Sequence, residues 1–428
     1  MKRPIGKRTL AAGLIAMMML TGCAGNTPAP TTKIVNDPDI KAAFNLNEVE
    51  AKKIDEDKFN SEYNRYSFKL MSQIASGAEK NCNIMISPTS IMMALDMCAA
   101  GAKGETLKQL NDLFAKDSDP VEQQAFASEL MKKINTAKNV DFLCANAIWN
   151  SKSAIGDKMN TTYKDYIKKT FGAEFRTVEF GSDTHKEINR WIDEKTNHMI
   201  KEAVPQLNPT TIMVLVNAIR FEGKWKEEYT DSQILEYDFK GTKGTKKTTM
   251  LSSSEYGYYF TEKATGFMKY YDGGEYAFLA ILPKDKNANA NDFLKSFTYE
   301  DYKEFIDSRV GMNVNTLMPE FKSDFEMPLN DTLKNLGVTD AFDPNKADFT
   351  GIAKGSETLY ISKVFHKTHI EVDRKGTKAA AVTTIEVDGA MPSEADFEEV
   401  FLNRPYAYAI VDVKTMNPVF IGTVNNVD

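Results

Sequence analysis

The chain has few of the residues and none of the common motifs on which enzyme sites are built. Its 428 residues include only four histidines and four cysteines, and they contain no G-x-S-x-G, H-E-x-x-H, Walker or G-x-G-x-x-G motif. His366 and His369 are three apart in a strand-like segment, so they should point to opposite faces and cannot bind one metal ion together. We therefore expect no metal, no cofactor and no enzymatic activity. A hydrolase whose Ser, His and Asp are scattered along the sequence is the alternative.

The cysteines also lack the spacing of a redox or metal motif. Cys82, Cys98 and Cys144 are odd in number and form no C-x-x-C pair, so we expect buried thiols. Cys23 differs, because it ends a basic and then apolar segment that is too short to span a bilayer. Residues 1–22 resemble the signal peptide of a bacterial lipoprotein, with an ordinary secretory signal as the alternative.

This N-terminal resemblance implies cleavage before Cys23 and attachment of lipid to its thiol. Residues 23–55, rich in Pro, Thr, Ala and Asn and then mixed in charge, would form a flexible tether. We expect the protein in the cell envelope, anchored to the outer membrane on its periplasmic or surface face. Contact with the membrane is expected through the N-terminal lipid alone.

Negative charge outweighs positive charge in the expected mature chain. Residues 1–22 carry four positive charges and no negative one, so their removal takes the net charge from −7 to −11. Nucleic-acid binding needs clustered Lys and Arg, so we expect no nucleic-acid partner. Lys132, Lys133 and Lys138 are too few to form a patch for a glycosaminoglycan.

Apolar periodicity predicts one α+β domain at residues 56–428, with helices mainly early and strands mainly late. Two amphipathic helices are predicted, one from Phe59, Tyr63, Tyr66, Leu70 and Ile74, and one from Ile188, Trp191, Ile192, Met199 and Ile200. The nearly unbroken apolar runs 213–221 and 275–283 predict strands buried on both faces. Residues 406–411 and 419–424 predict a closing hairpin.

Residues 372–400, "VDRKGTKAAAVTTIEVDGAMPSEADFEEV", have a pattern of their own. Gly376 offers a hinge, and from Thr377 to Gly389 every odd position is uncharged, whereas charges occur only at even positions. No proline interrupts 376–390, but an acidic stretch typical of an exposed loop follows. The segment therefore suits two states, an exposed loop and a β-strand. A permanent edge strand is the alternative.

The surrounding sequence resembles the serpin family from about residue 58 to the C-terminus. Five blocks in the same order carry this resemblance: "NIMISPTSIMMALDMCAAGAKGETLKQL" (83–110), "NAIRFEGKW" (217–225), "LNDTLKNLGVTDAF" with "ADFTGI", "LYISKVFHKTHIEVD" (359–373) and "NRPYAYAIVDVKTMNPVFIGTVNN" (403–426). The resemblance implies a serpin fold with three β-sheets, about eight or nine helices and an exposed reactive-centre loop at about residues 374–402.

The resemblance also implies the function of a protease inhibitor. A target serine protease, or alternatively a cysteine protease, would attack the loop and form a covalent 1:1 complex, and the cleaved loop would insert as a new strand in the main sheet. We expect a monomer. A serpin-fold protein that binds a partner without inhibiting a protease is the alternative within the family.

Family spacing places the reactive bond at Ala390–Met391, fourteen residues after the hinge glycine, which suits an elastase- or subtilisin-like protease. The hinge and inserting residues would be Gly376, Thr377, Ala379, Ala380, Ala381, Thr383 and Ile385. The resemblance carries over a polar cluster beneath the sheet and an aromatic residue at the insertion point: Ser87, Ser90, Asn217, His366 and Trp225.

Three basic residues depart from the family pattern. Arg374 stands where the family usually has an acid, Lys375 follows it, and Lys378 occupies a position where Glu is common. All three are expected to face solvent, so inhibition should be retained. They put the usual salt bridge with a lysine in doubt, and Asp373 is the candidate replacement for the missing acid.

Overall fold

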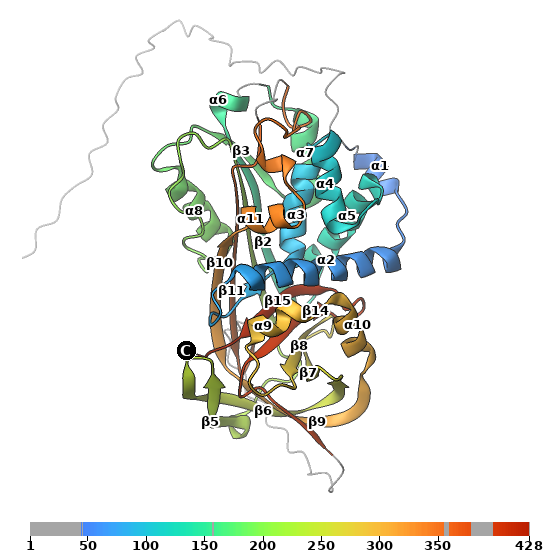
Figure 1. The fold of residues 1–428 in the computed structure, drawn as a ribbon, viewed down its shortest axis with the longest axis vertical. Helices are drawn as coiled ribbons and strands as arrows, with labels where there is room; N and C mark the ends of the chain where they lie inside the picture. The colour runs from blue at the N-terminus through green and yellow to red at the C-terminus, as the bar shows by residue number, and fades with distance from the viewer. Residues whose placement is uncertain (1–43, 45, 156–157, 355–358, 378–396, 428) are drawn as a thin grey trace, which may run out of the picture. The chain divides into compact units, whose positions relative to one another are not determined.

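The computed structural model describes residues 44, 46–155, 158–354, 359–377 and 397–427 (Figure 1). The chain divides into two units, 1–38 and 39–428, and every described residue lies in the second. The α-helices of the described part are α1 Leu46–Ala51, α2 Glu56–Gly77, α3 Pro88–Ala99, α4 Gly104–Phe114, α5 Pro120–Asn135, α6 Lys152–Ile155, α7 Thr161–Phe171, α8 Thr184–Lys195, α9 Ala290–Ser296, α10 Tyr299–Asp307 and α11 Asn330–Asn335. In this part of the chain, none is long and apolar enough to cross a membrane.

The strands form a six-stranded and a nine-stranded sheet, and the helices of the first half lie against the former (Figure 1). The first has the order β10-β11-β12-β4-β2-β3, with an additional β11–β4 pairing; the second has the order β1-β15-β14-β8-β7-β6-β9-β13, with β5 paired to β6. The strands are β1 Met85–Ile86, β2 Val140–Ser151, β3 Glu174–Val178, β4 Met213–Lys224, β5 Ile234–Gly241, β6 Gly244–Phe260, β7 Ala264–Tyr270, β8 Tyr276–Pro283, β9 Val310–Pro319, β10 Phe321–Pro328, β11 Lys363–Asp373, β12 Gly376–Thr377, β13 Glu398–Phe401, β14 Tyr406–Asp412 and β15 Pro418–Val424.

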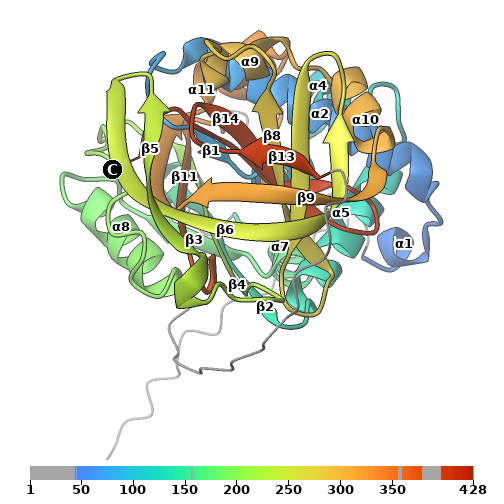
Figure 2. The ribbon, with the colours of Figure 1, turned by 90° about the horizontal axis from the view of Figure 1, so that it is seen from below.

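The expected α+β class with early helices and late strands is confirmed. The number of sheets and the number of helices differ in detail from the expectation. Hydrogen bonding joins two of the three expected sheets, because the 17-residue strand β6 pairs with β5 and β9 along most of its length and with β7 at Tyr258–Phe260. Figure 2 shows β6 as a long curved strand between β5 and β9. Three of the eleven described α-helices have six residues or fewer, which leaves eight longer ones.

The apolar runs form the expected buried elements. In β4 the residues from Met213 to Phe221 are all buried, and every residue of β8 is buried as well. The C-terminal run forms the antiparallel pair β14–β15, again fully buried. These strands supply the rigid core on which the rest of the domain is assembled.

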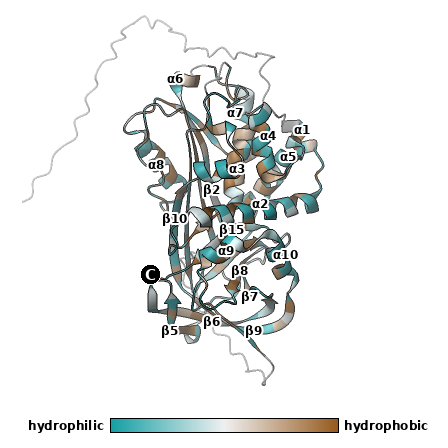
Figure 3. Cartoon of the chain, in the orientation of Figure 1, coloured by the Kyte–Doolittle hydropathy of each residue, from teal (hydrophilic) through white to brown (hydrophobic). Residues whose placement is uncertain are grey.

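Two helices show why the early segment folds as it does. Helix α2 begins after Asp55, whose side chain accepts a hydrogen bond from the Lys58 amide, and it buries the predicted apolar face. Hydrophobic and hydrophilic colours alternate along α2 in Figure 3, as expected for an amphipathic helix. Helix α3 differs, because all twelve of its residues are buried beneath the six-stranded sheet.

The second predicted helix ends earlier than its apolar spacing suggested. Helix α8 contains Ile188, Trp191 and Ile192, but it stops at Lys195, and Met199 and Ile200 lie beyond its end. Asn197 and His198 have φ angles of 52° and 64°, a left-handed conformation that ends the helix. The prediction of one helix through Ile200 was therefore wrong in its C-terminal half.

Packed structure starts before residue 56, although the sequence pattern placed the beginning of the domain at that residue. Helix α1 falls inside the expected tether, and its Val49 is buried, as is Phe44. The ammonium group of Lys52 lies 2.6 Å from the Asp119 carboxylate at the start of α5. The last part of the tether is thus docked on the helical layer by apolar and ionic contacts.

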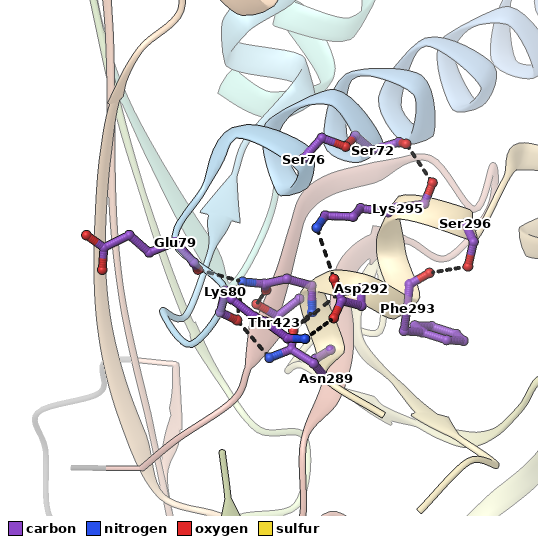
Figure 4. Close-up of polar contacts among 12 residues, drawn as sticks. Ser72, Ser76, Glu79, Lys80, Asn289, Asp292, Phe293, Lys295, Ser296 and Thr423 are labelled. Carbon is purple, nitrogen blue, oxygen red and sulfur yellow. Dashed lines mark hydrogen bonds and ion pairs between the residues drawn. The ribbon is translucent and has the colours of Figure 1, made fainter. Parts of the chain in front are cut away.

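An asparagine-rich cluster ties the C-terminal strand to the turn after α2 and to α9 (Figure 4). The Asn289 amide donates to the Lys80 carbonyl at 2.7 Å, and the Thr423 hydroxyl donates to Asn291 Oδ1 at 2.7 Å. Asn425, which is fully buried, donates to Asn291 Oδ1 at 3.0 Å. The cluster fixes the end of β15 without using charge in the core.

Candidate functional site

The six-stranded sheet is opened at one end by the start of the C-terminal segment. Strands β11 and β4 pair in parallel over six positions, from Lys363–Val214 to Thr368–Ile219. Beyond these positions the two strands diverge, and the two residues of β12 lie between them. Thr377 is opposite Val372 on one side and Gly223 on the other.

Gly376 occupies a position that only glycine can fill. Its φ angle is 154°, and a Cβ atom there would lie 2.1 Å from the carbonyl oxygen of Gly223 and 2.8 Å from the Cα atom of Lys224. Both obstacles are backbone atoms, which cannot move aside as a flexible side chain could. The expectation of unusual backbone freedom at Gly376 is thus matched by its geometry.

Thr377 is already buried in the sheet, with 1% of its surface exposed. Its hydroxyl lies 2.6 Å from the hydroxyl of Tyr271, and either atom could be the donor. Burial holds the pKa of Tyr271 well above its usual range, so this phenol remains protonated at physiological pH. The first expected inserting side chain therefore has a fixed polar partner inside the fold.

The turn that precedes β12 is held by backbone bonds to two aromatic residues. The indole nitrogen of Trp225 donates to the Asp373 carbonyl at 2.9 Å, and its backbone amide donates to the Lys375 carbonyl at 2.9 Å. The Tyr229 amide donates to the Arg374 carbonyl at 2.9 Å. The Trp225 ring also stacks on Tyr271, whose hydroxyl contacts Thr377, with ring centroids 4.6 Å apart. Trp225 therefore lies against the turn that leads into β12.

The ionic contacts of this turn run opposite to those that the resemblance implies. Arg374 places its guanidinium 2.6 Å from the Asp231 carboxylate, and its backbone amide donates to Glu320 Oε1 at 3.1 Å. Burial raises the pKa of Glu320, and the bond from the Arg374 amide partly offsets this effect. The basic residue, Arg374, belongs to the segment that leads into the expected loop. The acidic residues, Asp231 and Glu320, belong to the rest of the domain.

Among the described residues, Asp373 forms no salt bridge that would replace the missing acid. Its Oδ1 atom instead accepts hydrogen bonds from the backbone amides of Lys375, at 2.7 Å, and Gly376, at 3.1 Å. This Asx-type arrangement stabilises the turn itself. Arg374 is about half exposed as expected, and Lys378 lies outside the described residues.

A buried ion pair supports the aromatic residues from below. Lys269 and Glu255 are 4% and 14% exposed, with the ammonium group 2.8 Å from Oε1. The same ammonium lies 4.3 Å from the ring centroid of Tyr229 and 5.8 Å from that of Trp225. Neither charged residue was predicted, because only the fold brings β6 and β7 beneath the turn.

The four expected cluster residues do come together beneath the sheet. Asn217 on β4 accepts from the Ser90 hydroxyl at 2.5 Å and donates to the Ser90 carbonyl at 2.9 Å. The Nδ1 atom of His366 on β11 lies 3.1 Å from Asn217 Oδ1. Ser87 donates its backbone amide to His366 Nε2 at 3.2 Å. All four side chains are buried.

The hydrogen bonds fix the protonation of His366. Because Nε2 accepts from a backbone amide, the ring proton is on Nδ1, which donates to Asn217 Oδ1. Burial lowers the pKa of His366 to about 3, so the ring is neutral. His369 points to the opposite face, where it lies 2.8 Å from Asp324, as the alternation predicted.

Sequence reasoning missed Asn146, which extends the cluster to a third strand. The Asn217 amide donates to Asn146 Oδ1 at 2.6 Å, and the pair are direct neighbours in the register of β2 and β4. An asparagine between Ala145 and Ala147 in this strand was the only available signal. The cluster thus crosses three adjacent strands, β11, β4 and β2.

The remaining expected residues have no described structure. Cys23, Ala379, Ala380, Ala381, Thr383, Ile385, Ala390 and Met391 lie outside the described residues. Their roles stay predictions. Within the described ranges, no group of three or more His, Cys, Asp or Glu residues could hold a metal ion.

Comparisons with known proteins point to one family. The family model described as "Serpin (serine protease inhibitor)" matches residues 61–427. The native state of Tengpin, a thermophilic serpin, is 35% identical, with a TM-score of 0.80, over 88% of this chain and 96% of the other. Iripin-5 of Ixodes ricinus is 33% identical over 85% and 93% of the two chains. Leukocyte elastase inhibitor A of Mus musculus is 32% identical over 80% and 92%.

Proposed function

The chain belongs to the serpin family, whose members named above include protease inhibitors and not enzymes, and we propose that it traps a serine protease as a suicide substrate. In this reaction the protease serine attacks the carbonyl carbon of Ala390. The Ala390–Met391 peptide bond breaks, and the new amine of Met391 leaves with a proton. The remaining ester links protease and inhibitor one to one.

The observation that supports this proposal is the sheet opened by Gly376 and Thr377. Two residues of the segment are already paired with both β11 and β4, so further insertion would extend an existing strand. Residues inserted after them would gain backbone bonds on both sides, each worth about 1 kcal/mol net. Ile385 and Val387 would each add roughly 1.5–3 kcal/mol by burial.

The opposing cost comes from the β11–β4 pairing that insertion must break. Six positions are paired in parallel there, and the cluster around Asn217 bridges the same two strands. These contacts are the barrier that insertion of the loop would have to overcome. We infer that cleavage removes the restraint on the loop, whereas the free energy that insertion would gain stays the same.

The target class follows from the residues at the proposed reactive bond. Ala390, preceded by Gly389, suits a protease with a shallow apolar specificity pocket, such as an elastase- or subtilisin-like enzyme. The name of the mouse relative, leukocyte elastase inhibitor A, agrees with this class. We propose a serine protease as the target, and a cysteine protease as the second candidate class.

We further propose that the inhibitor is a bacterial lipoprotein of the cell envelope. The support is the sequence of residues 1–22 and Cys23, followed by the 23–55 segment. Lipid on Cys23 would hold a monomeric inhibitor at a membrane. Replacing Cys23 with Ala should move the protein from the membrane fraction to the soluble fraction, and mass spectrometry of the wild-type N-terminus should show the lipid.

Incubation with an elastase-type protease tests the inhibitory mechanism. A covalent band near the summed mass on a denaturing gel, together with a released peptide that begins at Met391, is the expected result. Clipping at the same bond without a covalent band would indicate a serpin-fold protein that does not inhibit. Mass spectrometry of the released peptide identifies the bond directly.

A further inference from the structure

Exposed large apolar side chains are concentrated on three paired strands. Among the described residues, Leu235, Tyr237, Tyr256, Phe260 and Val310 have 42–61% of their surface exposed. All five lie on β5, β6 or β9. Isolated exposed apolar residues are ordinary, but a contiguous cluster on neighbouring strands indicates an interaction surface.

Four residues at the end of β6 and the start of β9 form what we call the aromatic patch: Tyr256, Tyr258, Phe260 and Val310. Tyr258 is directly opposite Val310, and its ring stacks on Phe260 with centroids 5.5 Å apart and planes 12° apart. Figure 2 shows β6 and β9 side by side. The patch is thus a cross-strand cluster, not a set of separate side chains.

The exposed ring of Tyr256 is held in place, although 61% of its surface is exposed. A Cβ atom on Gly311 would lie 2.7 Å from the Tyr256 hydroxyl, which shows how closely the ring covers that glycine. Arg309 lies 5.8 Å from the ring centroid and donates to the Tyr256 carbonyl at 3.2 Å. A preorganised aromatic side chain loses little conformational freedom when a partner binds it.

The patch adjoins the point at which the described chain resumes after residue 396. Strand β13 begins at Glu398, which pairs with Val314 on β9. Val314 is four residues along β9 from Val310, the strand partner of Tyr258. Partial burial, and then the negative charge of Glu398, raise the pKa of Tyr258. The C-terminal end of the expected reactive loop is therefore fixed next to the aromatic patch.

Chain length limits where a protease bound at Ala390 can be. Phe397 is seven residues from Ala390, and an extended chain spans at most about 3.6 Å per residue, or about 25 Å here. A protease domain is on the order of 40 Å across. The surface around β13 and the patch is therefore within reach of an enzyme engaged at the reactive bond.

We propose that the aromatic patch is a second contact surface for the target protease, occupied by apolar side chains beside that enzyme's active-site cleft. This inference rests on the proposed function and adds a determinant of specificity outside the reactive loop. Aromatic side chains commonly dominate the binding energy of interfaces. The patch should increase the lifetime of the encounter complex and thereby the rate of covalent trapping.

The double variant Tyr256→Ser with Phe260→Ser tests the proposal. The measurement is the second-order rate constant for covalent complex formation with the elastase-type protease that wild type traps fastest. We expect about a tenfold decrease, with an unchanged number of inhibitor molecules consumed per protease and an unchanged melting temperature. Such a result separates contact with the protease from an effect on folding or insertion.

Leu235→Ser with Tyr237→Ser is the matched control. Tyr237 is opposite Thr248 on β6, ten residues from Tyr258 and thus about 30 Å along the strand, and both control residues are 45% exposed. The control should trap the protease at the wild-type rate. Equal rates of covalent complex formation for both double variants would overturn the proposal. Self-association of wild type that only the patch variant abolishes would also overturn it. Failure of wild type to trap any protease would overturn the proposed function together with this inference.

Discussion

His366 and Asn217 face each other across β11 and β4, with His366 Nδ1 donating to Asn217 Oδ1 over 3.1 Å. The two residues are also direct neighbours in the register of the strands. Any strand that enters between β11 and β4 at this level must separate them. This single bond therefore links the stability of the closed sheet to the movement proposed for the loop.

Asn217→Ala should weaken the closed sheet. The substitution removes the partner of His366, Ser90 and Asn146 and leaves buried polar groups unpaired, which costs about 2–4 kcal/mol in total. We expect a lower melting temperature and faster loss of inhibitory activity on prolonged warming, through spontaneous insertion or polymerisation. Asn335→Ala, at an exposed helix end, is the control. Time courses that match wild type would rule out gating by the cluster.

His366 should make the protein less stable in acid. Its pKa is lowered by burial from an ordinary value of 6.5 to about 3, so below pH 6.5 the unfolded chain binds a proton that the folded chain does not. The contribution of His366 to the free energy of unfolding is complete above pH 6.5. It is lost at about 1.4 kcal/mol per pH unit as the pH falls toward 3. His366→Gln should remove this dependence in chemical denaturation measured at several pH values.

Asp96 should make the protein less stable as the pH rises, which is opposite to the effect of His366. Burial raises the pKa of Asp96 from an ordinary 3.8 to about 8, so between these values the folded chain holds a proton that the unfolded chain has lost. Stability from this group is complete below pH 3.8 and falls as the pH rises to 8. Wild type should therefore vary little between pH 4 and 6.5, where the two effects cancel, and lose stability from pH 6.5 to 8.

Asp96→Asn tests this opposition with little change in shape. Asp96 Oδ1 accepts from the Gln123 amide at 2.8 Å, whereas Asp96 Oδ2 and Gln123 Oε1 have no hydrogen-bond partner among the described residues. An amide at residue 96 brings its own donor and cannot ionise. The variant should be more stable than wild type at pH 8, by about 1–3 kcal/mol, and should gain stability from pH 4 to 6.5. A variant that is less stable than wild type at pH 8 would contradict this assignment.

Gly376→Ala should expel β12 from the sheet. The added Cβ would meet the Gly223 carbonyl oxygen at 2.1 Å, and alanine also disfavours a φ angle of 154°. We expect the variant to be cleaved as a substrate more often than it traps the protease, which is measured as the number of inhibitor molecules consumed per enzyme. Gly181→Ala, whose Cβ would have no neighbour within 4 Å, should behave like wild type.

Arg374→Glu should loosen the hinge turn by placing a carboxylate beside two others. Asp231 and Glu320 both face Arg374, although Asp231 is 92% exposed, so the effect on stability should be below about 1 kcal/mol. We expect a few-fold faster loss of inhibitory activity on storage. Adding Asp231→Arg should restore the wild-type rate, and Arg374→Lys should have little effect. No rescue in the double variant would show that the charge pair has no role in holding the turn.

Local patterns predicted the buried strands because their cause is local. Met213–Phe221 and Tyr276–Pro283 are largely apolar, and the resulting strands are buried on both faces. The polar cluster was also predicted, but through family resemblance, since nothing in the spacing of Ser90 and Asn217 shows that α3 and β4 meet. The end of α8 was not predictable from periodicity, because the apolar pattern continues past the left-handed turn at Asn197.

Features that depend on pairing between distant strands were missed. Asn146 joins the cluster only through the register of β2 with β4, and Asp231 and Glu320 meet Arg374 only after three separate segments have folded together. The docking of α1 combines the burial of Val49 with an ion pair from Lys52 to Asp119, which are 67 residues apart. Charge and composition alone indicated a solvated tether there.

The melting temperature of the protein before and after cleavage at Ala390–Met391 tests the central claim most directly. If the uncleaved fold is held short of its most stable state by the β11–β4 pairing, the cleaved form should melt at a markedly higher temperature, because its loop completes the six-stranded sheet. A cleaved form that melts at or below the temperature of the intact protein would contradict the account. The same comparison with Gly376→Ala should show a smaller increase.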